Sequence, residues 1–161
     1  MRIVVLSDTH LQNGQSLPPI VWNSLSGIDL ILHAGDVVTP GLLSDLGVCA
    51  PVRAVRGNCD GWELANLPVR DIIDCDGLRV GLIHGNAGSG ESTPERAYWA
   101  FASEGVRAVV FGHSHSPYLQ WHNGILLFNP GSPTSKRRQP RYSFGILEIE
   151  NNKVTGRHIY F

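Results

Sequence analysis

Short apolar runs rich in β-branched residues recur along the chain, and in its first half amphipathic stretches separate them. The run at residues 3–6, Ile-Val-Val-Leu, is typical of a strand that is buried on both faces. We expect further strands at 29–33 and 52–55 and helices between them at 18–25 and 40–46. Gly47 is expected to end the second helix. This alternation of strands and helices predicts right-handed crossovers and a largely parallel sheet.

The second half of the chain changes to hairpins. We expect three pairs of strands, at 69–75 with 78–84, at 118–122 with 125–128, and at 142–150 with 154–160. Asp76-Gly77 and Asn123-Gly124 are strong signals for the two-residue turns that join such strands. The chain therefore passes from a crossover-built sheet to a hairpin-built sheet, and no linker separates the two.

Between the first two hairpins we expect a helix at 93–104 and a buried strand at 106–111. Thr93 is a plausible N-cap for this helix, and Gly105 is a plausible stop. Taken together, these elements predict an α/β fold in which two sheets pack face to face with helices outside. We expect a single domain that covers residues 1–161.

Composition limits the classes of partner. Among 161 residues, 13 Lys and Arg stand against 14 Asp and Glu, for a net charge of −1. This balance gives no electrostatic reason to bind a membrane or an extended nucleic acid. No stretch approaches the roughly 20 apolar residues of a membrane span. Cys49, Cys59 and Cys75 have no CxxC spacing, which favours a reducing compartment, and we expect a cytoplasmic protein.

Side chains of the types that bind metals gather at the ends of the predicted strands. They come from five separate segments, which contribute Asp8 and His10, Asp36, Asn58, His84, and His113 and His115. Each segment follows an apolar run, at the edge where open α/β sheets bind ligands. Residues two apart in an extended segment point to the same side, so each Asp-x-His or His-x-His pair can reach one centre. Seven candidate ligands exceed the three or four of a single zinc ion and suit two ions that share a carboxylate.

These residues resemble the motifs of the calcineurin-like metallophosphoesterase superfamily, which run Asp-x-His, Gly-Asp, Gly-Asn-His-Asp/Glu, His and Gly-His-x-His. In this chain they are Asp8-Thr9-His10, Gly35-Asp36, Gly57-Asn58-Cys59-Asp60, His84 and Gly112-His113-Ser114-His115. The similarity extends from residue 1 to about residue 135. In motif order and length the chain is similar to the small YfcE-type phosphodiesterase branch, to which Vps29 is related. This resemblance implies a four-layer αββα sandwich.

The resemblance also implies two divalent cations. One ion would be held by Asp8, His10, Asp36 and His115, and the other by Asp36, Asn58, His84 and His113. A hydroxide that bridges the ions would attack phosphorus in line, so the implied activity is hydrolysis of a phosphate ester, with diesters preferred. Mn²⁺ is favoured by the resemblance, and the mixed nitrogen and oxygen ligands also suit Zn²⁺, Fe²⁺ or Ni²⁺.

Three residues are implied to act on the substrate. His10 and Asn58 would polarise the phosphoryl oxygens or neighbouring ligands. Cys59 replaces a histidine of the family that stabilises or protonates the leaving group, which narrows the leaving groups that the chain can use. A second departure is Asn86, because relatives often carry another histidine two residues after the position of His84.

Other interpretations stay open at the level of sequence. The same fold could be a non-catalytic metal-binding scaffold for protein assembly, as in Vps29, but a decayed site would have lost ligands that are all present here. A phosphomonoesterase needs the same site, whereas a nuclease of polymers would favour a basic track. We expect a small phosphate-ester substrate, and the predicted oligomer is a homodimer. We interpret His33, His122 and His158 as structural. We interpret residues 136–138 as a solvated basic loop, which could also reach a substrate phosphate or bind a partner.

Overall fold

The apolar run at the N-terminus forms strand β1 (Arg2–Leu6), and its last four residues are fully buried. In the computed structural model, which describes residues 1–161, β1 is the central strand of a five-stranded sheet with the order β10-β9-β1-β2-β3. β2 (Leu30–His33) and β3 (Val52–Ala54) extend this sheet in parallel, as predicted. Helices α1 (Pro19–Asn23) and α2 (Pro40–Cys49) make the two crossovers.

The remaining strands of the first sheet come from the other end of the chain. β9 (Ser143–Glu150) pairs antiparallel with β1, and β10 (Lys153–Tyr160) pairs antiparallel with β9. The predicted third hairpin therefore does not form a separate sheet. It closes one side of the sheet that begins with β1, so this sheet is mixed rather than parallel.

The second sheet also has five strands, in the order β4-β5-β6-β8-β7. Its strands are β4 (Arg70–Cys75), β5 (Leu78–Ile83), β6 (Ala108–Val110), β7 (Tyr118–His122) and β8 (Ile125–Asn129). β5, β6 and β8 run parallel to one another, whereas β4 and β7 are the antiparallel edge strands supplied by the two predicted hairpins. Helix α3 (Thr93–Phe101) connects β5 to β6.

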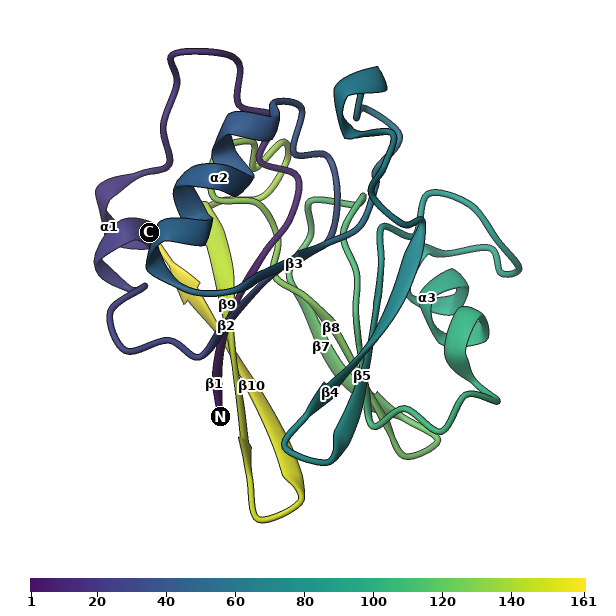
Figure 1. The fold of residues 1–161 in the computed structure, drawn as a ribbon. Coiled ribbons are helices and arrows are strands. Elements are labelled where there is room, and N and C mark those ends of the chain that lie inside the picture. The colour runs from purple at the N-terminus through teal and green to yellow at the C-terminus, as the bar shows by residue number, and fades with distance from the viewer.

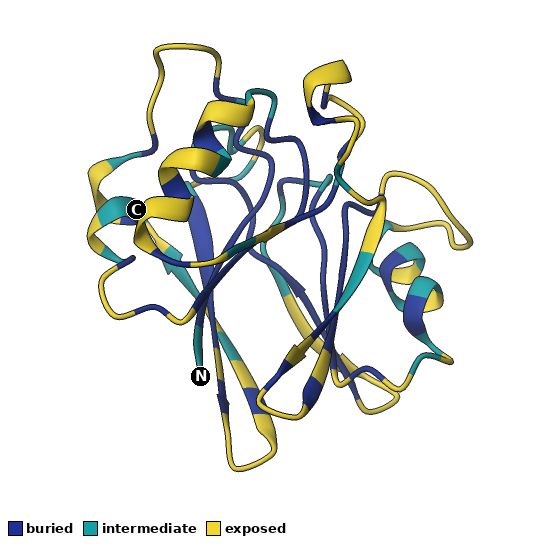
Figure 2. Cartoon of the chain, in the orientation of Figure 1, coloured by how far each residue is buried: buried dark blue, intermediate teal, exposed yellow.

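The elements form four layers, which confirms the expected αββα sandwich. Figure 1 shows α1 and α2 on the outer side of the first sheet and α3 on the outer side of the second. The largest apolar cluster lies between the sheets and includes Val5, Leu32, Leu82 and Phe128. Two further clusters join each sheet to its helices, so the inner strands are largely buried, while edge strands such as β7 and the outer faces of the helices are exposed (Figure 2).

The helix boundaries differ from the sequence expectation at both ends of α3 and at the end of α2. The N-cap of α3 is Ser92 rather than Thr93, because Ser92 accepts a hydrogen bond from the backbone N–H of Glu95 in a capping box. The helix ends at Phe101, and Gly105 instead terminates the turn that follows it. Gly47 does not end α2, which continues to Cys49. A Cβ at Gly47 would meet no other atom within 4 Å, so nothing there forces the chain to turn.

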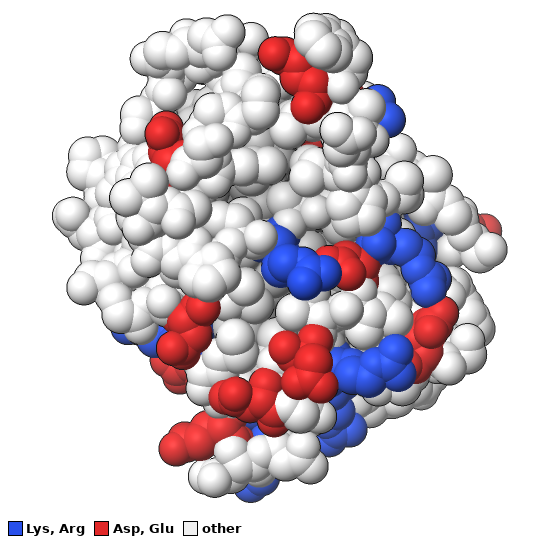
Figure 3. Space-filling view, viewed as in Figure 1, with Lys and Arg blue, Asp and Glu red and all other residues white.

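Two features of the surface bear on partners. No helix is both long and apolar enough to cross a bilayer. On the face shown in Figure 3, positive and negative side chains are interspersed, and no continuous basic track runs across it. This pattern agrees with the near-neutral net charge and gives no support to binding of an extended nucleic acid.

Candidate metal centre

The ends of five strands bring the seven candidate ligands together. β1, β2 and β3 are parallel, and so are β5 and β6, so the carboxyl ends of each group meet at one edge of their sheet. Loops after β1, β2 and β3 carry Asp8, His10, Asp36 and Asn58. Loops after β5 and β6 carry His84, His113 and His115. The sequence prediction that these segments converge is correct.

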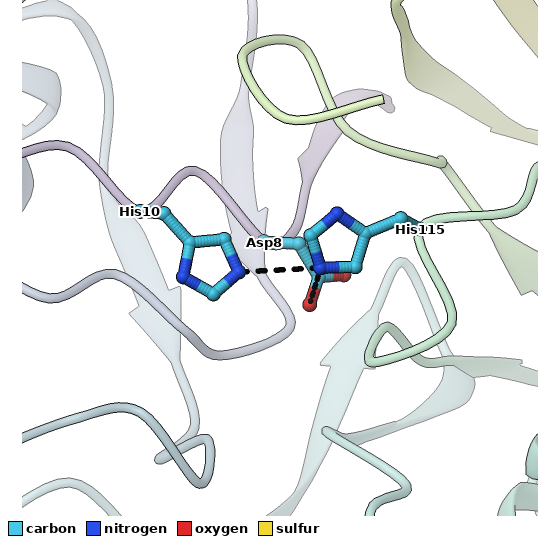
Figure 4. A group of neighbouring side chains, drawn as sticks. All are labelled: Asp8, His10 and His115. Atoms are coloured by element: carbon cyan, nitrogen blue, oxygen red, sulfur yellow. Dashed lines mark hydrogen bonds and ion pairs between the residues drawn. The ribbon is translucent and has the colours of Figure 1, made fainter. Parts of the chain in front are cut away.

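Asp8, His10 and His115 form the first group of possible ligands. His115 Nε2 lies 3.4 Å from Asp8 Oδ1 and 3.2 Å from His10 Nε2. The two imidazole rings are stacked, with centroids 5.0 Å apart. Figure 4 shows His10 and His115 entering from opposite sides, with the Asp8 carboxylate below His115. Segments more than 100 residues apart in the sequence therefore direct three ligand atoms at one point.

Asp36 connects this group to a second one. Its Oδ2 atom lies 3.6 Å from His10 Nε2 and 3.4 Å from His84 Nε2. His84 Nε2 is in turn 3.1 Å from Asn58 Oδ1. Ligand atoms of Asp8, Asp36 and His84 also lie within 4.8 Å of one another. The carboxylate of Asp36 thus faces imidazoles that come from both sheets.

His113 lies beside the second group but makes fewer contacts. Its ring approaches that of His84 edge-on, with 5.3 Å between the centroids. Its backbone N–H donates a hydrogen bond to Asp8 Oδ1, at 3.2 Å. The His113 side chain is partly exposed, whereas His84 and His115 are buried. The structure therefore places His113 at the rim of the cluster.

Unusual backbone conformations aim these side chains. Five of the seven candidate residues have φ between 47° and 66°, namely Asp8, His10, Asp36, His113 and His115. Non-glycine residues seldom adopt this left-handed region, and each instance costs on the order of 1–3 kcal/mol. Such conformations persist where surrounding contacts hold them, and they concentrate at functional sites.

Two glycines allow the loops to approach closely. A Cβ at Gly57 would overlap the backbone nitrogen and carboxylate of Asp36. A Cβ at Gly112 would overlap the hydroxyl of Ser7, next to Asp8. The glycines of the Gly-Asn and Gly-His motifs are therefore required because a neighbouring strand-end loop occupies the space of a side chain.

Backbone carbonyls orient the two buried histidines. His84 Nδ1 lies 2.7 Å from the carbonyl oxygen of Ala34, and His115 Nδ1 bonds to the carbonyl oxygen of Ser135. These contacts place the N–H on Nδ1. The lone pair of Nε2 of each ring then points toward the centre, where it can bind a metal ion. The sequence analysis missed both partners because a main-chain carbonyl has no signature in the sequence.

Asp60 fixes the loops that follow β2 and β3. Its carboxylate accepts hydrogen bonds from the backbone N–H groups of Asp36, Val38 and Gly57. Asp60 is thus a hydrogen-bond partner of three nearby backbone groups. It holds Asp36 next to the Gly57 turn without contacting the imidazoles itself.

Burial sets the protonation of the imidazoles. It lowers the pKa of His115 to about 4, although the Ser135 carbonyl opposes the shift. Burial likewise lowers the pKa of His10 and of His113. These three rings are therefore neutral near pH 7, which is the form that binds metal ions.

The acids respond to the same environment. Burial raises the pKa of Asp8 to about 7, and the neighbouring charge of His84 offsets part of that shift. Burial is the largest single effect on Asp36 and would raise its pKa, but hydrogen bonds from Cys59 and the contact with His84 together outweigh it and hold the pKa of Asp36 below its ordinary value. The same contact raises the pKa of His84 against the effect of burial. Two buried carboxylates facing imidazole nitrogens form a mixed oxygen and nitrogen donor set, which fits divalent cations.

Cys59 lies at the exposed side of the cluster. Its backbone N–H donates to Asp36 Oδ1 at 2.8 Å, and its sulfur lies 3.4 Å from Asn58 Nδ2. Partial burial of the sulfur, together with the nearby Asp36 carboxylate, raises the pKa of the Cys59 thiol to about 11. Without a metal ion the group is thus a protonated thiol at neutral pH and is poorly suited to be a nucleophile, although its sulfur lies within 4.8 Å of ligand atoms of His10 and Asp36.

The remaining histidines make structural contacts away from the ligand atoms. His33 is buried, with Nε2 3.1 Å from Thr9 Oγ1. His158 Nε2 lies 2.7 Å from the carbonyl oxygen of Asn129. His122 packs edge-on against the ring of Tyr98. These contacts agree with the structural interpretation of all three.

Comparisons with known proteins agree with this geometry. Residues 1–152 match the model of the calcineurin-like phosphoesterase superfamily domain. A probable metallophosphoesterase of Methanothermobacter thermautotrophicus is 35% identical over 155 residues, which cover 96% of this chain and 89% of the relative. Phosphodiesterase YfcE of Escherichia coli is 26% identical over 168 residues and covers 92% of this chain and 88% of its own.

The fold has a solved counterpart in Vps29 from Entamoeba histolytica, determined as a complex with Zn²⁺. The two structures align with a TM-score of 0.78 over 99% of each chain, at 21% sequence identity. This similarity concerns the fold, whereas the family match and the archaeal relative extend to the sequence. The chain therefore belongs to the calcineurin-like phosphoesterase superfamily.

Proposed function

We propose that this chain is a metal-dependent phosphodiesterase whose centre holds two divalent cations. The position of Asp36 carries the proposal, because one of its oxygen atoms lies 3.6 Å from His10 Nε2 and 3.4 Å from His84 Nε2. A carboxylate between two groups of nitrogen donors is the arrangement that a bridging ligand requires. A site for one ion would not need ligands on both sides of Asp36.

The proposed ligand sets share this aspartate. One ion is held by Asp8, His10, Asp36 and His115, and the other by Asp36, Asn58, His84 and His113. When bound, the two cations lower the pKa of water to near neutrality and offset the negative charge that develops on the phosphoryl group. We propose Mn²⁺ as the preferred ion, with Zn²⁺, Fe²⁺ or Ni²⁺ compatible with the same nitrogen and oxygen donors.

The chain's own residues then orient the substrate and handle its proton. The His10 side chain is about a quarter exposed, at 23%, so it borders both the ligand cluster and solvent. Asn58 is exposed beside it and can direct its amide toward a phosphoryl oxygen. Cys59 keeps its proton on Sγ at neutral pH and can donate a hydrogen bond to the departing oxygen. A thiol is a weak donor, so good leaving groups are favoured.

Preference for diesters rests on two observations. Phosphodiesterase YfcE is similar along most of this chain. The leaving-group position also carries Cys59 rather than an imidazolium that could neutralise the second negative charge of a monoester. The near-neutral net charge favours a small substrate over a polymer.

The proposal is tested by hydrolysis of bis(p-nitrophenyl) phosphate and of p-nitrophenyl phosphate, with each of the four metals added to metal-free protein. We expect turnover to require metal and to be faster for the diester. Asp36→Asn should lose on the order of a hundredfold or more in kcat/KM, since the bridging ligand is weakened. Asp45→Asn, at an exposed position of α2, is the matched control and should retain full activity.

Two outcomes would refute the proposal. Absence of turnover with every metal would favour a non-catalytic scaffold. Unchanged activity of Asp36→Asn would show that Asp36 is not a ligand shared by two ions. Faster hydrolysis of the monoester would replace the diester preference with a phosphomonoesterase. The oligomeric state stays a prediction of the sequence analysis, and sedimentation equilibrium would decide whether a homodimer forms.

A further inference from the structure

We infer that an open cleft beside the proposed centre binds a planar aromatic group, and that this group is the ester substituent that stays on phosphorus during hydrolysis. This inference rests on the proposed function and names a substrate class for it. The cleft has a volume of about 870 Å³ and begins at Thr9 and His10. His10 also contributes a candidate ligand atom close to Asp36, so a phosphate at the centre would be adjacent to the cleft.

The far wall of the cleft is aromatic and rigid. The rings of Tyr142 and Phe161 stack with centroids 5.9 Å apart and an angle of 25° between their planes. Two backbone hydrogen bonds of 3.1 Å tie these residues to each other, from each N–H to the other's carbonyl oxygen. Both residues are partly exposed, so part of each side chain faces solvent.

The rest of the lining is mixed, and polar residues such as Gln15, Ser16 and Thr134 stand among the apolar ones. Leu11, Leu17 and Pro133 line the cleft and are buried, so little of their surface is accessible to solvent. Figure 1 shows the end of the chain after β10 beside α1, and residues of both segments, Phe161 and Pro19, line the cleft. Apolar and aromatic walls with a polar centre at one end are the usual composition of a site for an aromatic ligand with a charged group.

The position of the cleft identifies which ester group it receives. Its lining includes His10 and Ser135 but neither Asn58 nor Cys59. In the proposed function the leaving group departs toward the Cys59 thiol. The substituent in the cleft is therefore the one that remains bonded to phosphorus. An aryl group and a nucleoside base share the planar aromatic chemistry that stacking on Tyr142 requires.

The experiment uses three diesters with one leaving group, p-nitrophenolate. Their retained groups are methyl, p-nitrophenyl and 5′-thymidyl, so differences in kcat/KM report the retained group. We expect the metal-loaded protein to prefer at least one aromatic ester over the methyl ester by about tenfold or more. Tyr142→Ala should remove this preference, so that kcat/KM for the aromatic esters falls toward the value for the methyl ester, and circular dichroism shows whether the variant is folded.

Two further variants sharpen the result. Tyr142→Leu retains an apolar side chain and should keep part of the preference. Tyr160→Ala removes an exposed tyrosine that does not line the cleft, and it should keep all of it. A preference for only one of the two aromatic esters would assign the cleft to that source, a simple aryl group or a nucleoside.

The cleft assignment is overturned if the methyl and aromatic esters react equally, or if Tyr142→Ala slows all three diesters by the same factor. Either result leaves the proposed function intact, because hydrolysis itself still occurs. Absence of turnover for all three diesters would instead refute the proposed function, and the cleft assignment with it.

Discussion

Arg137 is the charged residue whose position most directly concerns the anion at the proposed centre. It is exposed in the loop between β8 and β9 and borders a hollow with Ser114, the residue between two candidate ligands. After burial, its positive charge is among the causes that lower the pKa of His10, of His113 and of His115. A guanidinium in this location can approach a phosphoryl oxygen.

Arg137→Ala should therefore weaken substrate binding. We expect KM for bis(p-nitrophenyl) phosphate to rise about tenfold with little change in kcat, because attraction of a bound anion is lost in ground state and transition state alike. Arg138→Ala makes the same change of charge at the next exposed position and should have a smaller effect. If both variants raised KM equally, and if added salt abolished both increases, the attraction would come from the net charge of the loop and not from Arg137 in particular.

His33 makes the stability of the chain depend on pH. Complete burial lowers its pKa to about 4, and its Nδ1 atom has no hydrogen-bond partner. As the pH falls below about 6.5, the unfolded chain binds a proton at His33 while the folded chain does not until about pH 4. The free energy of unfolding should therefore decrease across this window, by on the order of 3 kcal/mol from this residue.

The check is urea unfolding of metal-free protein at several pH values between 7 and 4. His33→Gln lacks the titrating ring, so its stability should fall less steeply over this range, even if the variant is less stable at pH 7. His122→Gln removes an exposed ring and should follow the slope of the unaltered chain. Parallel slopes for His33→Gln and the unaltered chain would show that His33 does not cause the decrease.

At the residue scale, the candidate ligand side chains could be predicted from the sequence, whereas the backbone groups that orient them could not. The seven candidate ligands could be found because Asp, His and Asn at strand ends are distinctive in a mostly apolar pattern. The carbonyl groups of Ala34 and Ser135 could not be found, since every residue has one and only the fold selects which faces an imidazole. Left-handed conformations at non-glycine residues such as Asp8 were equally invisible.

Element boundaries depend on local hydrogen bonds that compete over one or two residues. Ser92 and Thr93 are both good N-cap residues, and Pro94 fits within the first turn after either. Glu95 decides between them, because it stands at the third position after Ser92. Its carboxylate accepts a hydrogen bond from the Ser92 backbone N–H, at 3.1 Å. The hairpins were easier to predict, since Asp-Gly and Asn-Gly turns leave few alternatives.

Ser92→Ala should destabilise α3. It removes the hydroxyl that accepts the Glu95 N–H and should cost about 1 kcal/mol of unfolding free energy. For a domain of this length that corresponds to a fall in Tm of roughly 2–4 °C. Ser26→Ala, at an exposed position outside the helices, is the control and should melt like the unaltered chain. A Thr93→Ala variant that lost more stability than Ser92→Ala would contradict the assigned cap.

The whole molecule joins two sheets that the sequence does not relate to each other directly. Hydrophobic patterning identifies strands, but it does not fix the order β10-β9-β1-β2-β3, in which the last hairpin returns to the first strand. Convergence of the ligands was predictable only because binding chemistry needs several of them at one place. The candidate centre therefore revealed a long-range contact, between the segments of Asp8 and His115, that the pattern of apolar residues does not encode.

Because each sheet supplies part of the ligand set, metal binding should stabilise the contact between the sheets. Asp8, His10, Asp36 and Asn58 follow strands of one sheet, and His84, His113 and His115 follow strands of the other. An ion that binds only the folded chain adds about 4 kcal/mol when its free concentration is a thousand times the Kd. We expect Mn²⁺ or Zn²⁺ to raise the Tm of metal-free protein by roughly 10 °C at that excess.

Two variants show whether the stabilisation comes from a shared centre. Asp36→Asn should lose most of the metal-induced rise in Tm, because Asp36 contacts imidazoles of both groups. His113→Ala affects only the second proposed ion, and it should lose part of the rise while calorimetry with metal-free protein reports one bound ion instead of two. If His113→Ala left both the rise and the number of bound ions unchanged, the second ion would need other ligands, even though the first could still join the sheets through Asp8 and His115.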